Sequence, residues 1–405
     1  MVKGELLVHL AGVLLFTVVA CVLFYDAKMT SQLHISEEKK KQLKYHEWKI
    51  YDEAKAAFPT KAKSRSVMLL HGYTPFWNAG SEATAHAVNR MLVEKGHEVW
   101  VGVPGYPNRI YEGVHIFDAD NRVLLHNLMK NTHVISTHSF RDKCLKLSDQ
   151  YGTAYIDWLH GGTYTMNVRK SQKEDKPNQF AIFNCDSLVE SFSDADKMKY
   201  HVLRPPVDWR EYEVPNTMPK YVTLSNLNEN KGGHILIEIA RITPHVEFLG
   251  VRGSYWKQIE DNTLPNITYI DNTPQIKDVY AQTKILIMPS KEETWGRTAV
   301  EAMSSGIPVI ASPTPGLKEC CQGAALFVER DDIQEWSRLI SRLCTDKSFY
   351  EEYSSRGRIR AKQLEPTHDL EMYQEWFEQK VLPAATAVTA VKSKPTPLQI
   401  FLDTY

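Results

Sequence analysis

The sequence predicts an α/β protein with two doubly wound domains, because a strand–loop–helix–strand pattern occurs in both halves of the chain. In the N-terminal half, an apolar strand at Val67–Leu70 precedes a glycine-containing loop, a helix at Ala83–Lys95 and a second strand within Gly96–Val101. In the C-terminal half, the strand Tyr221–Leu224 begins another series of this kind. The length of 405 residues accommodates two ordinary domains with extensions.

Further apolar runs, each bounded by turn residues, extend both series. Those of the first half have the length of buried strands, and those of the second half alternate between strand and helix patterns. In chain order, the additional predicted elements are Val114–Phe117, Thr132–Ile135, Ala154–Ile156, the helix Ile235–Ile242, the strands Val246–Leu249 and Ile267–Ile270, and the short helix Gln275–Ala281.

The most informative segment of the chain lies in its C-terminal half. The apolar run Lys284–Met288 predicts a buried parallel strand, and Gly296 precedes an apolar-faced helix. Gly306 stands where a helix C-terminus favours a left-handed residue, and Pro308 forbids continuation before the next strand at Val309–Ala311. A helix N-terminus at the carboxyl edge of a sheet favours anionic ligands. The segment therefore predicts an anion site beside Gly296.

Two glutamates flank this predicted anion site, Glu293 in the loop and Glu301 on the helix, with seven residues between them. A phosphate repels a neighbouring carboxylate, so the carboxylate needs hydroxyl groups from which it can accept hydrogen bonds. We therefore interpret the pair as acceptors for sugar hydroxyls next to a phosphate. A surface helix whose glutamates only face water is the alternative.

Glu293, seven residues, Glu301 and the following Ala-Met-Ser-Ser-Gly-Ile-Pro-Val-Ile resemble the nucleotide-sugar signature of glycosyltransferase family 4, or glycosyl transferases group 1. The resemblance implies a retaining enzyme of the GT-B fold, in which two Rossmann-like domains face a cleft. It further implies that Glu301 binds the donor ribose and that Glu293 lies against the transferred sugar. The backbone amides of four consecutive residues would face the diphosphate and sugar, namely Trp295, Gly296, Arg297 and Thr298.

The N-terminal half resembles the same family. The loop after the first strand contains Gly80, where the backbone is expected to approach donor phosphate or acceptor without an intervening Cβ, and the next helix ends in the Gly-His-x-Val of Gly96–Val99. His160 follows a predicted strand at the place where the family carries His-Gly, which implies contact with the donor sugar or its reaction centre. His71 and His138 also follow strands and are competing candidates.

The loop Ser225–Gly233 aligns with a family segment that carries Gly-Arg-Leu followed by Lys-Gly. Lys231 matches the lysine, which implies that it contacts the donor diphosphate. Asn226 replaces the arginine, and an amide can donate to phosphate but brings no charge. Lys231 and the helix N-terminus, with help from Arg297 or Arg252, are then expected to neutralise the diphosphate, because an unpaired buried charge is costly. This charge balance predicts metal-independent catalysis, with Lys231, Glu293 and His160 as candidate catalytic residues.

The N-terminal segment predicts a membrane anchor. Leu6–Tyr25 is a largely apolar stretch of twenty residues without formal charge, long enough to span a bilayer and lacking a small-x-small cleavage site after it. Lysines after this span outnumber Lys3 before it, which favours a cytosolic catalytic part, with a lumenal type II orientation as the alternative. Ser36–Ala57 is predicted to be a charged stem helix, at the membrane surface or in solvent. The chain contains the glycosylation sequon Asn266–Thr268.

These observations give a predicted domain organisation. The resemblance covers about Val67 to Gln363, and the segment after it carries a helix pattern that in GT-B proteins crosses back to the N-terminal domain. The predicted parts are an anchor at 1–26, a stem at 27–63, an acceptor-side domain at 64–214 with a linker at Glu211–Pro219, a nucleotide-sugar domain at 215–365, a crossover helix at 366–383 and a flexible tail at 384–405.

Composition and competing motifs narrow the function classes. The net charge of −1 offers no basic field and argues against nucleic acid as a partner, and the six cysteines lack metal-site spacing. The expected donor is a nucleoside-diphosphate sugar, with UDP and GDP both open, and the expected acceptor is a glycan or a membrane-associated, lipid-linked molecule. Asp118 and Asp120 form the Asp-x-Asp of metal-dependent GT-A enzymes, as Asp194 and Asp196 also do. A GT-B-fold sugar-nucleotide epimerase and a catalytically inactive carbohydrate-binding relative also remain open.

Overall fold

The computed structural model describes residues 62–386, apart from residues 76, 78, 161–175, 193–194, 196–197 and 216–218. The described residues all belong to the second of two compact units, Ala57–Tyr405. The predicted anchor, the predicted stem up to residue 61 and the tail beyond residue 386 lie outside the described part of the chain. Within the described residues, no helix combines the length and the apolar character that crossing a membrane requires.

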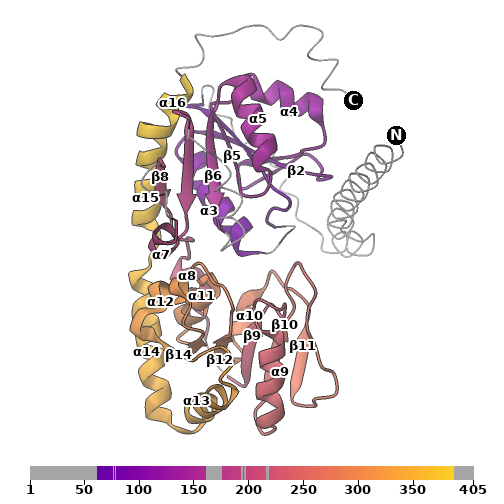
Figure 1. Cartoon of the computed structure of the whole chain (residues 1–405), viewed down its shortest axis with the longest axis vertical. Helices are drawn as coiled ribbons and strands as arrows, with labels where there is room; N and C mark the ends of the chain where they lie inside the picture. Colours follow the sequence, from indigo (N-terminus) through magenta and orange to yellow (C-terminus); the bar gives the residue numbers. More distant parts are fainter. Residues whose placement is uncertain are drawn as a thin grey trace, which may run out of the picture. The chain divides into compact units, whose positions relative to one another are not determined.

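The N-terminal sheet has the strand order β3-β4-β2-β1-β5-β6-β7-β8, and all neighbours pair in parallel except β3 and β4. The sheet is doubly wound, because the chain moves outward from β1 to one edge and then continues from β5 towards the other. The strands are β1 Arg65–Leu69, β2 Glu98–Val103, β3 Arg109–Tyr111, β4 Val114–Asp118, β5 Val134–Thr137, β6 Ala154–Leu159, β7 Gln179–Phe183 and β8 Tyr200–Val202. The helices, labelled in Figure 1, are α3 Gly80–Glu94, α4 Arg122–Met129, α5 Arg141–Tyr151, α7 Asp186–Glu190 and α8 Trp209–Tyr212.

The C-terminal sheet has the order β11-β10-β9-β12-β13-β14, with every neighbouring pair parallel. This is the strand order of dinucleotide-binding Rossmann domains, with its switch point between β9 and β12. The strands are β9 Tyr221–Ser225, β10 Phe248–Val251, β11 Ile267–Ile270, β12 Thr283–Met288, β13 Val309–Ala311 and β14 Ala325–Phe327. The helices are α9 Gly233–Ile242, α10 Ile276–Tyr280, α11 Arg297–Ser304, α12 Pro315–Cys321, the 3₁₀ turn η2 Gln322–Ala324, α13 Ile333–Thr345 and α14 Lys347–Gln363.

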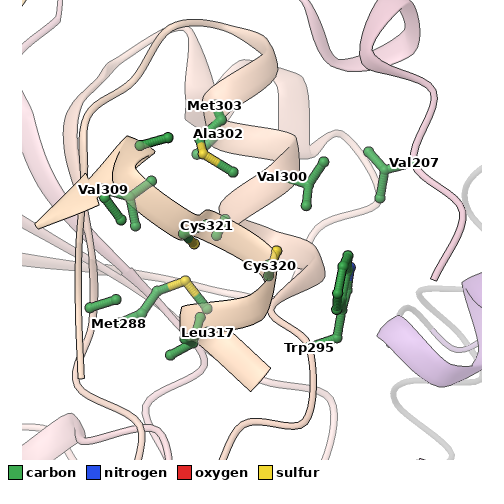
Figure 2. Close-up of a cluster of buried hydrophobic side chains, with 14 of the residues drawn as sticks. Val207, Met288, Trp295, Val300, Ala302, Met303, Val309, Leu317, Cys320 and Cys321 are labelled. Carbon is green, nitrogen blue, oxygen red and sulfur yellow. The ribbon is translucent and has the colours of Figure 1, made fainter. Parts of the chain in front are cut away.

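The predicted strand–helix–strand segment of the C-terminal half is confirmed. Gly296 precedes α11 with φ of 109°, and Gly306 follows it with φ of 69°, so a left-handed glycine stands at each end. The inner face of α11 packs into a buried apolar cluster, in which Figure 2 labels Val300, Ala302 and Met303 together with Val309 of β13. Packing on β12 and β13 thus fixes the helix whose N-terminus the sequence assigns to the ligand.

The C-terminal helices return to the N-terminal sheet. Helix α15 (Thr367–Trp376) continues through the π-helical segment η3 (Phe377–Val381) into α16 (Leu382–Thr386), and Figure 1 shows α15 beside β8. Tyr373 packs against Trp158 of β6 and His201 of β8, and Glu378 bonds to His97 before β2. These contacts attach α15 and η3 to the N-terminal domain, as the predicted crossover requires.

Two predicted boundaries are wrong in detail. Helix α16 continues through Thr386, past the predicted start of the tail at residue 384, because Ala385 is buried against the rest of the domain. The predicted linker overlaps the short helix α8, which begins at Trp209 because the Asp208 carboxylate accepts from the Arg210 amide and caps it. Packing therefore sets the end of α16 and capping sets the start of α8, and composition sets neither boundary.

Candidate active site

A cavity of about 350 Å³ lies where the two doubly wound sheets meet. Its walls come from the loop after β1, the ends of β6 and β7, the loops after β9, β10 and β12, and the first turns of α11. Ligands of open α/β sheets bind at the carboxyl ends of the strands flanking the switch point, and β9 and β12 are these strands here. All ten sequence-predicted site residues line this cavity, namely Gly80, His160, Asn226, Lys231, Glu293, Trp295, Gly296, Arg297, Thr298 and Glu301.

The N-terminus of α11 faces the cavity through its glycine. A Cβ on Gly296 would lie 2.6 Å from Leu317 Cδ2, and its φ of 109° is one that side-chain-bearing residues rarely adopt. The first turn of a helix has amide groups without intrahelical partners and carries partial positive charge. Glycine is therefore required for the backbone to turn into α11 and present these amides, as the prediction of an anion site assumes.

Glu301 is held rigidly by two side chains. It is 8% exposed, and its carboxylate accepts a hydrogen bond of 2.7 Å from the Tyr280 hydroxyl and forms an ion pair of 2.8 Å with Arg297 Nε. Burial together with the nearby carboxylate raises the pKa of Tyr280 well above its usual value, so the phenol remains a donor. Two of the roughly four acceptor positions of the carboxylate are used. The remaining positions are free to accept from ligand hydroxyls.

Arg297 has a different environment from the expected one. Beyond its bond to Glu301, the guanidinium donates to the Pro206 carbonyl at 2.5 Å and to the Tyr212 hydroxyl at 2.7 Å. Burial by itself lowers the pKa of this group, but Glu301 and Tyr212 raise it to a net value above the usual one. Because all three nitrogens of the guanidinium are engaged, Arg297 positions Glu301, and the expectation that its charge helps to neutralise the diphosphate is not supported.

Lys231 and Glu293 form an ion pair inside the cavity. Lys231 follows β9, Glu293 follows β12, and their loops pack closely, since a Cβ on Gly232 would lie 2.7 Å from the Pro289 carbonyl oxygen. The two charges of the pair neutralise each other locally. An entering phosphate would therefore compete with Glu293 for the lysine.

Asn226 and Arg252 provide no free positive charge to the cavity. Asn226 has a left-handed φ of 72°, and its side-chain oxygen accepts from the Asn228 amide at 3.2 Å. Arg252 bonds to Glu260 at 2.7 and 2.8 Å and to Asp271 at 3.0 Å, and hydrogen bonding to Glu260 raises its pKa. Of the groups that the sequence predicts to bind the phosphates, Lys231 and the α11 amides are therefore the ones that can do so.

His160 enters the cavity from the end of β6. Its ring stacks on Trp158 at a centroid distance of 5.5 Å and an interplanar angle of 23°. Burial, with a smaller contribution from His138, lowers the pKa of His160 to about 3, so the imidazole is neutral at physiological pH. The competing His138 lies 3.7 Å from Glu82, and neither it nor His71 lines the cavity.

Gly80 lines the cavity, but its contacts within the protein do not require a glycine there. An added Cβ would lie 3.7 Å from Arg297 Cδ, which is an ordinary van der Waals distance. The predicted close approach of a ligand to this backbone stays a prediction.

Four residues that sequence reasoning missed complete the site. Tyr280 and Tyr212 hold Glu301 and Arg297, and Asn184 and Thr294 join the two domains through a hydrogen bond of 2.7 Å. Thr294 lies between Glu293 and Glu301 in the motif, so its position was a weak indication that it belongs to the site. The other three come from distant segments without a motif, so only folding brings them to the site.

The Asp-x-Asp motif has a structural role at the end of β4. The Asp118 carboxylate accepts from the backbone amides of Gly105 at 2.8 Å and Asp120 at 2.9 Å, which closes a turn away from the cavity lining. The second such motif, at residues 194 and 196, lies outside the described residues. Two doubly wound sheets are also not the architecture that the GT-A interpretation requires.

Two Rossmann-like domains with a cavity at their switch points define the GT-B class of α/β proteins. The fold is similar to sucrose-phosphate synthase from Thermosynechococcus elongatus, with a TM-score of 0.64 and 14% identity over 80% of this chain and 100% of that chain. Anabaena HepE in complex with UDP and glucose gives a TM-score of 0.62 and 16% identity, over 78% of this chain and 100% of that chain. Identities this low establish the fold alone.

Residues 208–360 match the family model of glycosyl transferases group 1. The match covers the C-terminal domain and supports the resemblance identified from the motif.

Sequence relatives agree with this assignment over short stretches. The chain is 32% identical to O-antigen chain mannosyltransferase B of Escherichia coli over 27% of this chain and 29% of the relative. It is also 32% identical to D-inositol 3-phosphate glycosyltransferase 1 of Catenulispora acidiphila, over 18% of each chain. The matches thus span less than a third of these relatives' length.

Proposed function

We propose that the protein is a retaining glycosyltransferase that moves a sugar from a nucleoside-diphosphate sugar to a glycan or membrane-associated acceptor. One observation carries the proposal: Lys231, the N-terminus of α11 and two carboxylates with seven residues between them share one cavity with His160 of the other domain. Cations and helix amides suit a diphosphate, and fixed carboxylates suit sugar hydroxyls.

The donor would lie across the switch point of the C-terminal sheet. Glu301, fixed by Tyr280 and Arg297, accepts from the ribose hydroxyls, and the diphosphate binds Lys231 and the α11 amides. When the diphosphate binds Lys231, Glu293 is released from its ion pair and accepts from hydroxyls of the transferred sugar. The phosphate site is thereby linked to the sugar site through one pair of side chains.

Transfer in this proposal relies on stabilising the leaving diphosphate. The acceptor attacks from the face that the diphosphate leaves, and a phosphate oxygen helps to take the acceptor proton, so configuration is retained without a strong side-chain base. His160, neutral because burial lowers its pKa to about 3, then contributes a polar contact rather than a proton transfer at physiological pH. Lys231 and the helix amides provide the charge that a metal ion provides in GT-A enzymes, so catalysis is proposed to be metal-independent.

The acceptor side is proposed from the sequence of the N-terminal segment. Residues 6–25 have the length and apolar character of a bilayer span, and lysines follow them. A single-pass anchor with a cytosolic catalytic part would bring the cavity close to membrane-bound acceptors.

Donor turnover by the full-length protein in detergent tests the proposal. Incubation with UDP-glucose, UDP-N-acetylglucosamine or GDP-mannose should release nucleoside diphosphate from one of them, by slow hydrolysis or by transfer to added glycan. Conversion of a donor into an isomeric sugar nucleotide would favour the epimerase interpretation. Binding of a donor without turnover under any acceptor condition would favour an inactive carbohydrate-binding protein.

A further inference from the structure

Three residues that line the cavity each carry a buried polar atom that has no hydrogen-bond partner within the described part of the chain. These atoms are the Nε2 of His160, the side-chain oxygen of Asn184 and the indole nitrogen of Trp295. Asn184 is 4% exposed and Trp295 is 3% exposed. Buried polar groups in folded proteins are nearly always bonded, because leaving one unsatisfied is destabilising. Such groups gathered around one cavity indicate a polar ligand that satisfies them.

The orientation of the Asn184 amide follows from its neighbours. The Thr294 hydroxyl lies 3.0 Å from the His160 carbonyl oxygen, which can only accept, so the single hydroxyl proton is donated there. The atom of Asn184 that lies 2.7 Å from the Thr294 oxygen must then be a donor, which is the amide nitrogen Nδ2. The amide oxygen Oδ1 is therefore the atom left without a partner.

The segment that carries Asn184 is fixed in place. Asn184 follows β7 and lies two residues before α7, whose first amides donate to the Glu319 carboxylate at 3.1 Å from Asp186 and 2.8 Å from Ser187. Glu319 belongs to α12 of the C-terminal domain. The bond to Thr294 thus holds the Asn184 side chain and the bonds to Glu319 hold the backbone that follows it, which reduces the conformational entropy lost when a ligand binds.

The chemistry of Asn184 Oδ1 indicates which group of a ligand it can bind. An amide oxygen is neutral and only accepts, so it pairs with a hydroxyl and not with a phosphate oxygen, which is itself an acceptor. Its bonded partner Thr294 is the residue after Glu293, the carboxylate assigned to the transferred sugar. The cavity at this point is the sugar end of the proposed donor site.

We propose that Asn184 selects the sugar: its Oδ1 accepts a hydrogen bond from one hydroxyl of the transferred sugar, and Thr294 positions the amide. The inference rests on the proposed function, because it places a sugar nucleotide in the cavity. It adds a residue of the N-terminal domain to sugar recognition, across the domain boundary from Glu293.

Binding of monodeoxy donors tests this assignment. Full-length wild-type protein and Asn184→Ala are titrated with UDP-glucose, UDP-N-acetylglucosamine and GDP-mannose, and the donor that binds is compared with its 2-, 3-, 4- and 6-deoxy forms where those positions carry a hydroxyl. We expect Asn184→Ala to bind the parent donor roughly 10- to 100-fold more weakly, the range for one lost contact to a hydroxyl. Wild type should bind one of the deoxy donors more weakly than the parent donor, by a similar factor. Asn184→Ala should bind that deoxy donor and the parent donor with equal affinity.

Two further measurements separate sugar recognition from a structural role. Asn184→Ala should bind the nucleoside diphosphate without sugar as wild type does, because the amide is not in the phosphate site. Thr294→Val should reduce the ratio between the affinities for the parent donor and for that deoxy donor. Thr294→Ser keeps the hydroxyl and should have the wild-type ratio. Asn184→Ala that responds to every deoxy donor as wild type does, or that loses nucleoside diphosphate affinity equally, would overturn the assignment. Wild type that binds a donor but never turns it over would instead overturn the proposed function alone.

Discussion

At the scale of single residues, the Lys231–Glu293 ion pair has the most direct consequence for ligand binding. Each charge of this pair neutralises the other, so in the proposed function the diphosphate displaces Glu293 when it binds the lysine. The same carboxylate is assigned to the transferred sugar. The proposed function therefore couples nucleotide binding to sugar binding through this pair.

Glu293→Gln should accordingly tighten the binding of nucleoside diphosphate several-fold while it lowers sugar transfer, because Lys231 loses its competing partner and the sugar loses an anionic acceptor. Calorimetry with UDP and GDP, and a turnover assay, measure the two effects. Glu292→Gln is the matched control, since it removes the same charge one residue away from an exposed position. Unchanged or weaker nucleotide binding by Glu293→Gln would contradict the competition.

Glu301 depends on Tyr280, which donates a buried hydrogen bond to it. Glu301→Ala should weaken nucleoside diphosphate binding by about 1–3 kcal/mol through the lost ribose contacts. Tyr280→Phe should weaken nucleotide binding by a smaller factor, and for ribonucleotides alone. The Glu301 carboxylate stays in place in this variant but loses one of the two side chains that fix it. The measurement is the affinity ratio between UDP and 2′-deoxy-UDP, or between the corresponding guanosine nucleotides. A Tyr280→Phe protein with the wild-type ratio would show that the phenol does not act through Glu301.

At the scale of elements, the start of α11 depends on Gly296, whose φ of 109° and proximity to Leu317 exclude a side chain. Gly296→Ala should lower the free energy of unfolding by about 1–3 kcal/mol, the usual range for one residue forced into a disfavoured conformation. Gly323→Ala is the control, because a Cβ there meets nothing within 4 Å. Equal chemical denaturation midpoints for the two variants would contradict the requirement.

Element positions were largely predictable because each strand is a continuous apolar run between turn residues. The predicted strands Ile267–Ile270 and Val309–Ala311 have the bounds that the structure gives. Helix ends were less predictable. Helix α3 begins at Gly80 rather than Ala83, because Gly80, Ser81 and Glu82 are already helical before the apolar periodicity starts.

The candidate site was predictable where one motif carried it, and not where folding assembled it. The motif placed Glu293, Glu301 and the α11 N-terminus together, since sequence spacing fixes their positions on one loop and helix. The charge of Arg297 led to its predicted contact with phosphate. A sequence does not show which side chains contact a charge, and the partner Tyr212 is 85 residues away from Arg297. Asn184 carried no signal, because its role depends on Thr294 of the other domain.

At the scale of the whole molecule, the proposed anchor makes a prediction about membrane orientation. Protease added to sealed vesicles should digest the catalytic part if it faces the cytosol, as the lysines after residues 6–25 favour. Detergent-opened vesicles are the control for protease access. Full protection in sealed vesicles would establish the lumenal orientation.

Glycosylation of Asn266 is a poor substitute for this experiment. The side-chain nitrogen of Asn266 donates to the backbone carbonyls of Ala240, Thr243 and Val246 at 3.0 to 3.2 Å. A folded chain therefore offers no free amide at the sequon, whichever side of the membrane it occupies. An unmodified Asn266 would not distinguish the two orientations.

The central claim is that Lys231 and the α11 amides, without a metal ion, stabilise the departing diphosphate of a sugar nucleotide. Nucleoside diphosphate release from the preferred donor, measured with full-length protein in excess EDTA, tests this claim most directly. The account predicts release at the rate seen without EDTA, a roughly 10²–10³-fold loss in Lys231→Ala, and a change within a few-fold in Asp118→Asn. Release that stops in EDTA and returns with Mn²⁺, disappears in Asp118→Asn and survives in Lys231→Ala would contradict it.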